Sequence, residues 1–128
     1  MILYHATLAK NASSIKKNGL RVSKGEKKSY DGSDNKGLLF LANDWDVAYD
    51  FVEVAQMDFD KPEAEDSIIV FGIDTKHLKQ KDLVPDRNII WEPNDEVYAF
   101  EYPHDIPARF LKVYREQNQP LNEKSNFR

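Results

Sequence analysis

Two polar side chains, His5 and Thr7, come at the end of a short apolar run, Ile2–Ala6, and this stretch is the best placed in the chain to hold a ligand. The run has the length and composition of a β-strand, and a helix is expected to begin directly after it. We therefore interpret the rest of the chain as a scaffold that positions His5.

Basic residues are concentrated near the start of the chain. Residues 1–28 contain seven lysines and arginines and one acid, so they carry +6, whereas the whole chain carries −4 and the remainder −10. A local basic lobe on an acidic protein favours a phosphate-bearing ligand over a long nucleic-acid track. Arg21 is the candidate for binding a pyrophosphate, and the alternative is that it belongs to a solvated basic surface.

The composition limits the chemistry. At 128 residues the chain has the size of one domain, which we place at residues 1–116, followed by a polar tail at 117–128. The absence of cysteine excludes disulfides, thiolate nucleophiles and Cys-ligated metals, and the three histidines lack HExxH or HxH spacing, so no metal is expected. No apolar run approaches the roughly 20 residues that cross a bilayer, and no secretory signal is recognisable. We expect a soluble, cytoplasmic protein without a membrane partner.

The apolar pattern predicts two helices and several strands. The predicted strands are Ile2–Ala6, Gly37–Ala42, Ser67–Asp74, Glu96–Glu101 and Ile106–Tyr114. One helix ends at about Asn18, before Gly19, and the other runs from Asn43 or Asp44 through Ala55. Because strands dominate and the later ones are joined by short turns, we expect an α+β domain with a largely antiparallel sheet.

Two tyrosines are candidates for contact with a ligand. Tyr30 is the only large ring in the polar segment 23–36, where it is either part of a lid or an exposed loop residue. Tyr49 borders the apolar stripe of the second helix, where it either packs or lines a site.

Three segments occur in an order that matches a known family. They are Leu3–Thr7, Gly37–Ala42 with Ala48-Tyr49 downstream, and Glu96–Phe100 followed by Ile106–Leu111. Together they resemble the ADP-ribosyltransferase superfamily, particularly its diphtheria-toxin-like branch with a His-Tyr-Glu triad, whose strands read His-Gly-Ser/Thr, Gly-Ile-Tyr-Phe-Ala and Glu-Tyr-x-Val. The resemblance covers nearly the whole chain to residue 115. It implies a split antiparallel β-sheet core with two helices in the N-terminal half.

The resemblance also implies that NAD is bound as a substrate, with a role for each matched residue. Glu96 would be catalytic, because a carboxylate that hydrogen-bonds the ribose stabilises the oxocarbenium-like charge that develops when the nicotinamide bond breaks. His5 would hydrogen-bond the adenosine ribose as a neutral imidazole, and Thr7 would add a hydroxyl contact. The backbone amide of Ala6 would pair with the nicotinamide carboxamide.

The chain departs from the family pattern at three positions. Ala6 stands where the families usually have glycine, and Leu39 stands at the tyrosine position of the second strand. Asp50 falls where the ring that stacks on nicotinamide would be by strict count. Tyr49 or Tyr30 is the ring that would replace it.

We therefore expect an enzyme that transfers ADP-ribose from NAD to a macromolecular acceptor, a protein or a nucleic acid, and releases nicotinamide without a metal. Glu92 and Glu101 are alternatives to Glu96 as the catalytic carboxylate. RNA 2′-phosphotransferases are a second resemblance, but they grip phosphate with arginines where this chain has mostly lysines. A catalytically inactive nucleotide-binding or protein-blocking module on the same fold is the third alternative.

Overall fold

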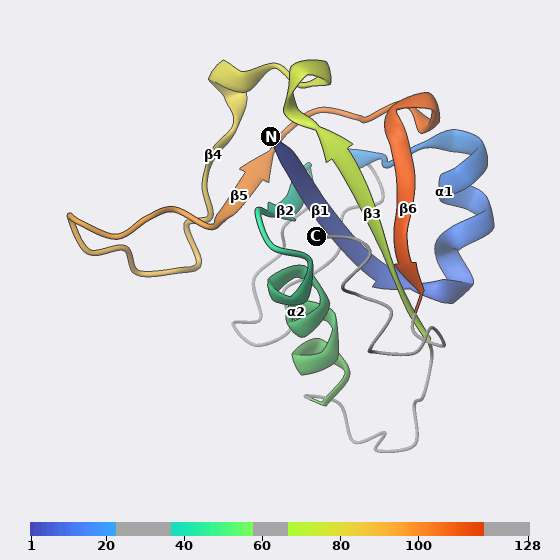
Figure 1. Cartoon of the computed structure of the whole chain (residues 1–128), viewed down its shortest axis with the longest axis horizontal. Helices are drawn as coiled ribbons and strands as arrows, with labels where there is room; N and C mark the ends of the chain where they lie inside the picture. The colour runs from blue at the N-terminus through green and yellow to red at the C-terminus, as the bar shows by residue number, and fades with distance from the viewer. Residues whose placement is uncertain (23–36, 58–66, 117–128) are drawn as a thin grey trace.

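A single six-stranded antiparallel sheet with two α-helices forms the domain in a computed structural model of the chain (Figure 1). The structure describes residues 1–22, 37–57 and 67–116. The expectations for Tyr30 and for the tail 117–128 lie outside these residues. The mixed α+β class expected from the sequence is confirmed.

The strands are arranged in the order β4-β5-β2-β1-β3-β6. Their bounds are β1 Ile2–Leu8, β2 Leu39–Ala42, β3 Ile68–Asp74, β4 Val84–Pro85, β5 Ala99–Tyr102 and β6 Leu111–Glu116. The α-helices are α1, Ala12–Asn18, and α2, Trp45–Met57, and short 3-10 turns occur at η1 Ala9–Asn11, η3 Thr75–His77, η4 Gln80–Asp82 and η5 Ala108–Phe110. Both helices lie in the N-terminal half, as predicted.

The two helices pack on opposite faces of the sheet. Successive strand residues point to opposite faces, so Leu3 and Ala6 of β1 belong to different sides. Leu3 lies in a buried cluster with Leu39 and Leu41 of β2, against which Ile15 of α1 packs. Ala6 lies in a second cluster with side chains of β2 and β3, under Trp45 and Ala48 of α2.

The central strand β1 is paired very unequally with its two neighbours. It pairs with β3 along its whole length, from Ile2↔Asp74 to Leu8↔Ile68. With β2 it shares a single paired position, Tyr4↔Ala42. The ladder between β1 and β2 therefore stops where β1 continues toward Thr7, and this part of the sheet is open to side chains and ligands.

The end of α1 is fixed by a glycine, as the sequence predicted. Gly19 has a φ of +81°, a backbone conformation that residues other than glycine rarely adopt. The following residue, Leu20, exchanges two backbone hydrogen bonds of 2.9 Å with Ile106. This bridge ties the α1 end to the segment before β6.

Two strand predictions were wrong by three residues or more at their beginnings. The strand predicted at Glu96–Glu101 starts only at Ala99, because a turn at residues 92–95 and an irregular stretch come before it. The strand predicted at Ile106–Tyr114 starts at Leu111, because Ala108–Phe110 form a 3-10 turn after Pro107. The first of these differences affects the placement of Glu96.

Candidate functional site

His5 is held in one orientation by the neighbouring strand. Its side chain is buried, and Nδ1 lies 2.9 Å from the backbone oxygen of Phe40 in β2. A carbonyl oxygen only accepts hydrogen bonds, so Nδ1 carries the proton and donates it. In the neutral imidazole Nε2 is then an acceptor, which suits it to receive a hydrogen bond from a ligand hydroxyl. The bond to Phe40 forms where the β1–β2 ladder has ended.

Thr7 lies two residues further on the same face of β1 and is also buried. Its Oγ1 accepts a hydrogen bond of 3.0 Å from Nδ2 of Asn11, at the start of the helical segment. The side chain of Asn11 therefore fixes the Thr7 hydroxyl. A pair of buried polar residues at a strand end, both with fixed orientation, is the arrangement expected of a preorganised binding site.

A pocket of about 490 Å³ opens beside these residues, between β1, β2 and α1. Its polar lining consists of His5, Thr7, Asn11, Ser14, Asn18 and Arg21. Ile15, Leu20 and Leu39 form part of its apolar wall. Its size is that of pockets that hold small molecules and cofactors. Of the residues predicted from sequence, His5, Thr7 and Arg21 are brought together here.

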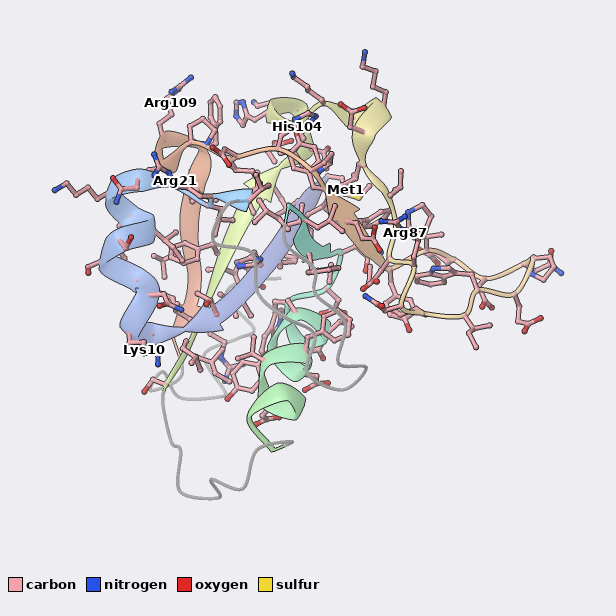
Figure 2. All side chains as sticks on the ribbon, turned by 180° about the vertical axis from the view of Figure 1, so that it is seen from behind. Met1, Lys10, Arg21, Arg87, His104 and Arg109 are labelled. Carbon is pink, nitrogen blue, oxygen red and sulfur yellow. The ribbon has the colours of Figure 1, made fainter. Side chains whose placement is uncertain are left out.

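Arg21 supplies a cation at this pocket. It is exposed and follows the end of α1, while Lys10 lies near the other end of the helix (Figure 2). None of the described residues that line the pocket is acidic. The pocket therefore combines hydrogen-bonding groups with one positive charge and suits a ligand with hydroxyl and anionic groups.

Asn11, Ser14 and Asn18 were missed by the sequence reasoning. They occur at positions i, i+3 and i+7, and this spacing places them on one side of a helix. The signal was present as a polar stripe beside the apolar Ile15.

Ala6 and Tyr49 do not line the pocket with their side chains. Ala6 points to the opposite face of the sheet, against α2, so only its backbone remains a candidate for ligand contact. Tyr49 lies on α2 at that same face, where it contacts Trp45 edge-on with a centroid separation of 6.2 Å. Burial is the main cause that raises the pKa of its phenol. The sheet therefore separates Tyr49 from this pocket, and its position agrees with the alternative in which Tyr49 packs.

Glu96 is exposed and lies outside the pocket. Tyr4, Ala42 and Ala99 form a row across β1, β2 and β5, and β1 and β5 run in the same direction. Glu96 lies three residues before Ala99, so an extended chain places it at most about 10 Å from this row, on the side of the start of β1. Thr7 follows Tyr4 by three residues in the other direction. The structure therefore places Glu96 and the pocket on opposite sides of this row.

Of the two alternative carboxylates, Glu101 has a structural role. It is 2% exposed, and its two oxygens accept hydrogen bonds from Nε and the backbone N–H of Arg87 at 2.9 and 2.7 Å. It pairs with Phe40, so it points to the face of the sheet away from His5. Glu92 is exposed at a turn in which its backbone N–H donates to Asp95. Neither carboxylate approaches the pocket.

Two further observations concern metal binding and helices that could span a membrane. In the described residues, no three His, Asp or Glu side chains come together as a metal ion would require. No helix within residues 1–22, 37–57 and 67–116 has the length and apolarity needed to span a membrane.

Comparison with protein-family models, with curated proteins and with solved structures finds no match to this chain.

Proposed function

We propose that this domain binds NAD in the pocket between β1, β2 and α1 and transfers ADP-ribose from it to a macromolecular acceptor, with release of nicotinamide. The observation that carries the proposal is the position of the three segments that resemble ADP-ribosyltransferase motifs. They contain β1, β2 and the start of β5, and these strands are consecutive neighbours in the sheet. Segments far apart in sequence therefore lie side by side in one sheet, and this juxtaposition supports the proposal.

The pocket offers groups that suit each part of the ligand. His5 presents Nε2 as an acceptor for a ribose hydroxyl, because Nδ1 is engaged with Phe40. Arg21 is the cation for the pyrophosphate, which guanidinium groups bind well. The single paired position between β1 and β2 is in keeping with a split sheet, in which backbone groups of Ala6 would reach the nicotinamide carboxamide.

Glu96 is the catalytic carboxylate of the proposal. Glu101 is buried against Arg87 and faces away from His5, so the proposal does not give it the catalytic role. NAD is an extended molecule with two riboses, and the proposal requires it to span from the pocket past the Tyr4–Ala42–Ala99 row to Glu96.

A second candidate function is nucleotide binding without turnover. It is favoured by the absence of an acidic residue among the described pocket residues and by the exposed position of Glu96 ahead of β5. Leu39, which lines the pocket in place of the family tyrosine, favours it as well. In this case the same pocket would bind NAD or ADP-ribose, and the nicotinamide bond would remain intact.

One set of measurements separates these functions. Calorimetry with NAD and ADP-ribose measures binding, and chromatography of free nicotinamide measures turnover. His5→Ala is expected to abolish binding, whereas Glu96→Gln is expected to retain binding and to lower nicotinamide release by a factor on the order of 10²–10³. Glu92→Gln is the matched control, since it makes the same change at another exposed carboxylate of the same segment.

Three outcomes would redirect the proposal. Binding without nicotinamide release from the unmodified protein would support the non-catalytic module. Loss of release in Glu92→Gln but not in Glu96→Gln would assign the catalytic role to Glu92. Removal of the phosphate from a 2′-phosphorylated RNA in the presence of NAD would establish the phosphotransferase alternative, although Arg21 is the only arginine among the described pocket residues.

A further inference from the structure

Three separate segments that carry basic residues lie next to one another at the edge of the domain beside the pocket: the Leu20–Ile106 bridge joins the end of α1 to the segment of η5, and His77 of η3 contacts Phe110 of η5. We call this surface the basic edge, and it consists of Lys16, Lys17, Arg21, Lys76, His77 and Arg109. All six are exposed. The backbone bridge between Leu20 and Ile106 holds η5, which carries Arg109, next to the end of α1. Figure 2 shows Arg21 and Arg109 together at this end of the helix, with Lys10 at the other.

At the basic edge the ring of Phe110 forms a stack with an imidazole and also contacts a guanidinium. The imidazole of His77 lies on the ring of Phe110 with a centroid separation of 4.1 Å and an interplanar angle of 8°. The guanidinium carbon of Arg109 lies 4.5 Å from the centroid of the same ring. Phe110 itself packs against the core, so the stack is anchored to the domain.

The carboxylates close to the basic edge are already engaged. Asp105 accepts a hydrogen bond of 2.9 Å from the backbone N–H of Val22. Asp74 accepts the backbone N–H of Lys76 at 3.1 Å and lies 4.0 Å from the amino group of Met1. Five lysine and arginine charges face these two acids, so the surface keeps a positive charge on an otherwise acidic chain.

We propose that the basic edge binds a short single-stranded segment of nucleic acid. Unpaired bases stack on histidine rings and on arginine planes, and the exposed outer sides of His77 and Arg109 offer both. In this proposal Arg21, Lys16 and Lys76, which belong to the same neighbouring segments, contact the phosphates of the bound strand. A duplex hides its base faces and gains nothing from such a stack, and so the ligand is single-stranded.

This inference rests on the proposed function in one respect, since it names the class of macromolecule that would receive ADP-ribose. The surface lies next to the pocket, because Arg21 belongs to both. Nucleic-acid binding itself needs neither NAD nor Glu96. It is therefore tested without NAD, and its failure is distinguishable from a failure of NAD binding.

Fluorescence anisotropy with a 5′-labelled 12-nucleotide oligouridylate and an oligothymidylate of the same length tests the proposal on the full chain. The expected result is binding to both single strands, with at least tenfold weaker binding to a 12-base-pair duplex. Two to three phosphate contacts predict a slope of log affinity against log salt of about −1.4 to −2.1. Arg109→Gln and His77→Ala should each weaken binding by roughly five- to a hundredfold, the range measured for loss of base stacking.

Lys10→Gln is the matched control, since it also removes one positive charge from the α1 side but at the far end of the helix. It should change affinity less than threefold, and Arg109→Gln should leave the affinity for NAD within twofold, since Arg109 is not among the pocket residues. Equal losses in Lys10→Gln and Arg109→Gln would overturn the proposal, as would duplex binding as tight as single-strand binding. Tighter binding to heparin or to anionic vesicles than to the oligonucleotides would overturn it too.

Discussion

Gly19→Ala is expected to unfold or severely destabilise this domain. The added Cβ would lie 2.3 Å from the backbone oxygen of Ile106 and 2.8 Å from the backbone nitrogen of Ala108. Backbone atoms cannot swing aside as the end of a side chain can. The substitution would therefore push apart the segments that the Leu20–Ile106 bridge joins.

The magnitude follows from two contributions. An alanine held at φ +81° and ψ −176° costs about 1–3 kcal/mol in backbone strain. Loss of the two backbone hydrogen bonds between Leu20 and Ile106 costs about 1 kcal/mol each. We expect Gly19→Ala to lower the free energy of unfolding by about 3–5 kcal/mol, which is a large share of the roughly 5–15 kcal/mol that stabilises a typical domain.

Gly37→Ala provides the matched control. Gly37 also has a positive φ, +88°, but a Cβ built there meets no atom of the described residues within 4 Å. Only the backbone strain remains, so the expected loss is about 1–2 kcal/mol. Urea unfolding followed by the fluorescence of Trp45, which is buried, measures both variants. Equal losses in the two variants would refute the role of the close approach between Gly19 and Ile106.

Three other predictions follow from hydrogen bonds. Glu101→Gln should lower the free energy of unfolding by about 2–3 kcal/mol in a urea titration, because an amide cannot accept both hydrogen bonds from Arg87. The control Glu96→Gln should change the free energy of unfolding by less than about 0.5 kcal/mol. Similar losses in the two variants would contradict this explanation. A hydrogen bond of 2.7 Å from Nε2 of His104 lowers the pKa of Asp82, so this carboxylate stabilises the fold above its unfolded pKa, about 3.9, and the contribution is lost as pH falls through the lower folded pKa. Asp82→Asn should therefore lose less stability than the unmodified protein when urea midpoints are compared from pH 5 to pH 2, and identical pH profiles would disprove this. Thr7→Val should weaken NAD binding measured by calorimetry by roughly tenfold, because it removes one hydrogen-bonding hydroxyl from the pocket. The control Thr75→Val changes a buried threonine outside the pocket and should leave NAD binding unchanged. Equal effects of the two substitutions would show a general loss of stability instead.

The position of Glu96 shows where sequence reasoning about the site fails. Residues 96–100 alternate as a strand does, and this pattern predicted a strand from Glu96. The structure begins β5 only at Ala99, and the contacts of β5 with the segment before it are distant in sequence: the N–H of Asp86 donates to the oxygen of Ala99, and that of Arg87 donates to Glu101. These contacts join residues that are 13 and 14 positions apart, so no local sequence pattern indicates them.

Residue types and their local spacing were sufficient for the elements that have a periodic signal. They predicted β3, both helices and the glycine at the end of α1, because burial imposes a period of two or 3.6 residues and a positive φ requires glycine. They also indicated His5, Thr7 and Arg21 as candidates, and in the structure these three residues line one pocket.

Tertiary structure alone decided which of these residues meet. Strand order and the face of the sheet separate Tyr49 and Glu101 from His5, and the early end of the β1–β2 ladder opens the pocket beside it. The separation of these residues and the opening of the pocket both depend on pairing between strands more than thirty residues apart in sequence. The partner strand sets the register of a strand, and a shift of one residue would move every side chain to the other face of the sheet.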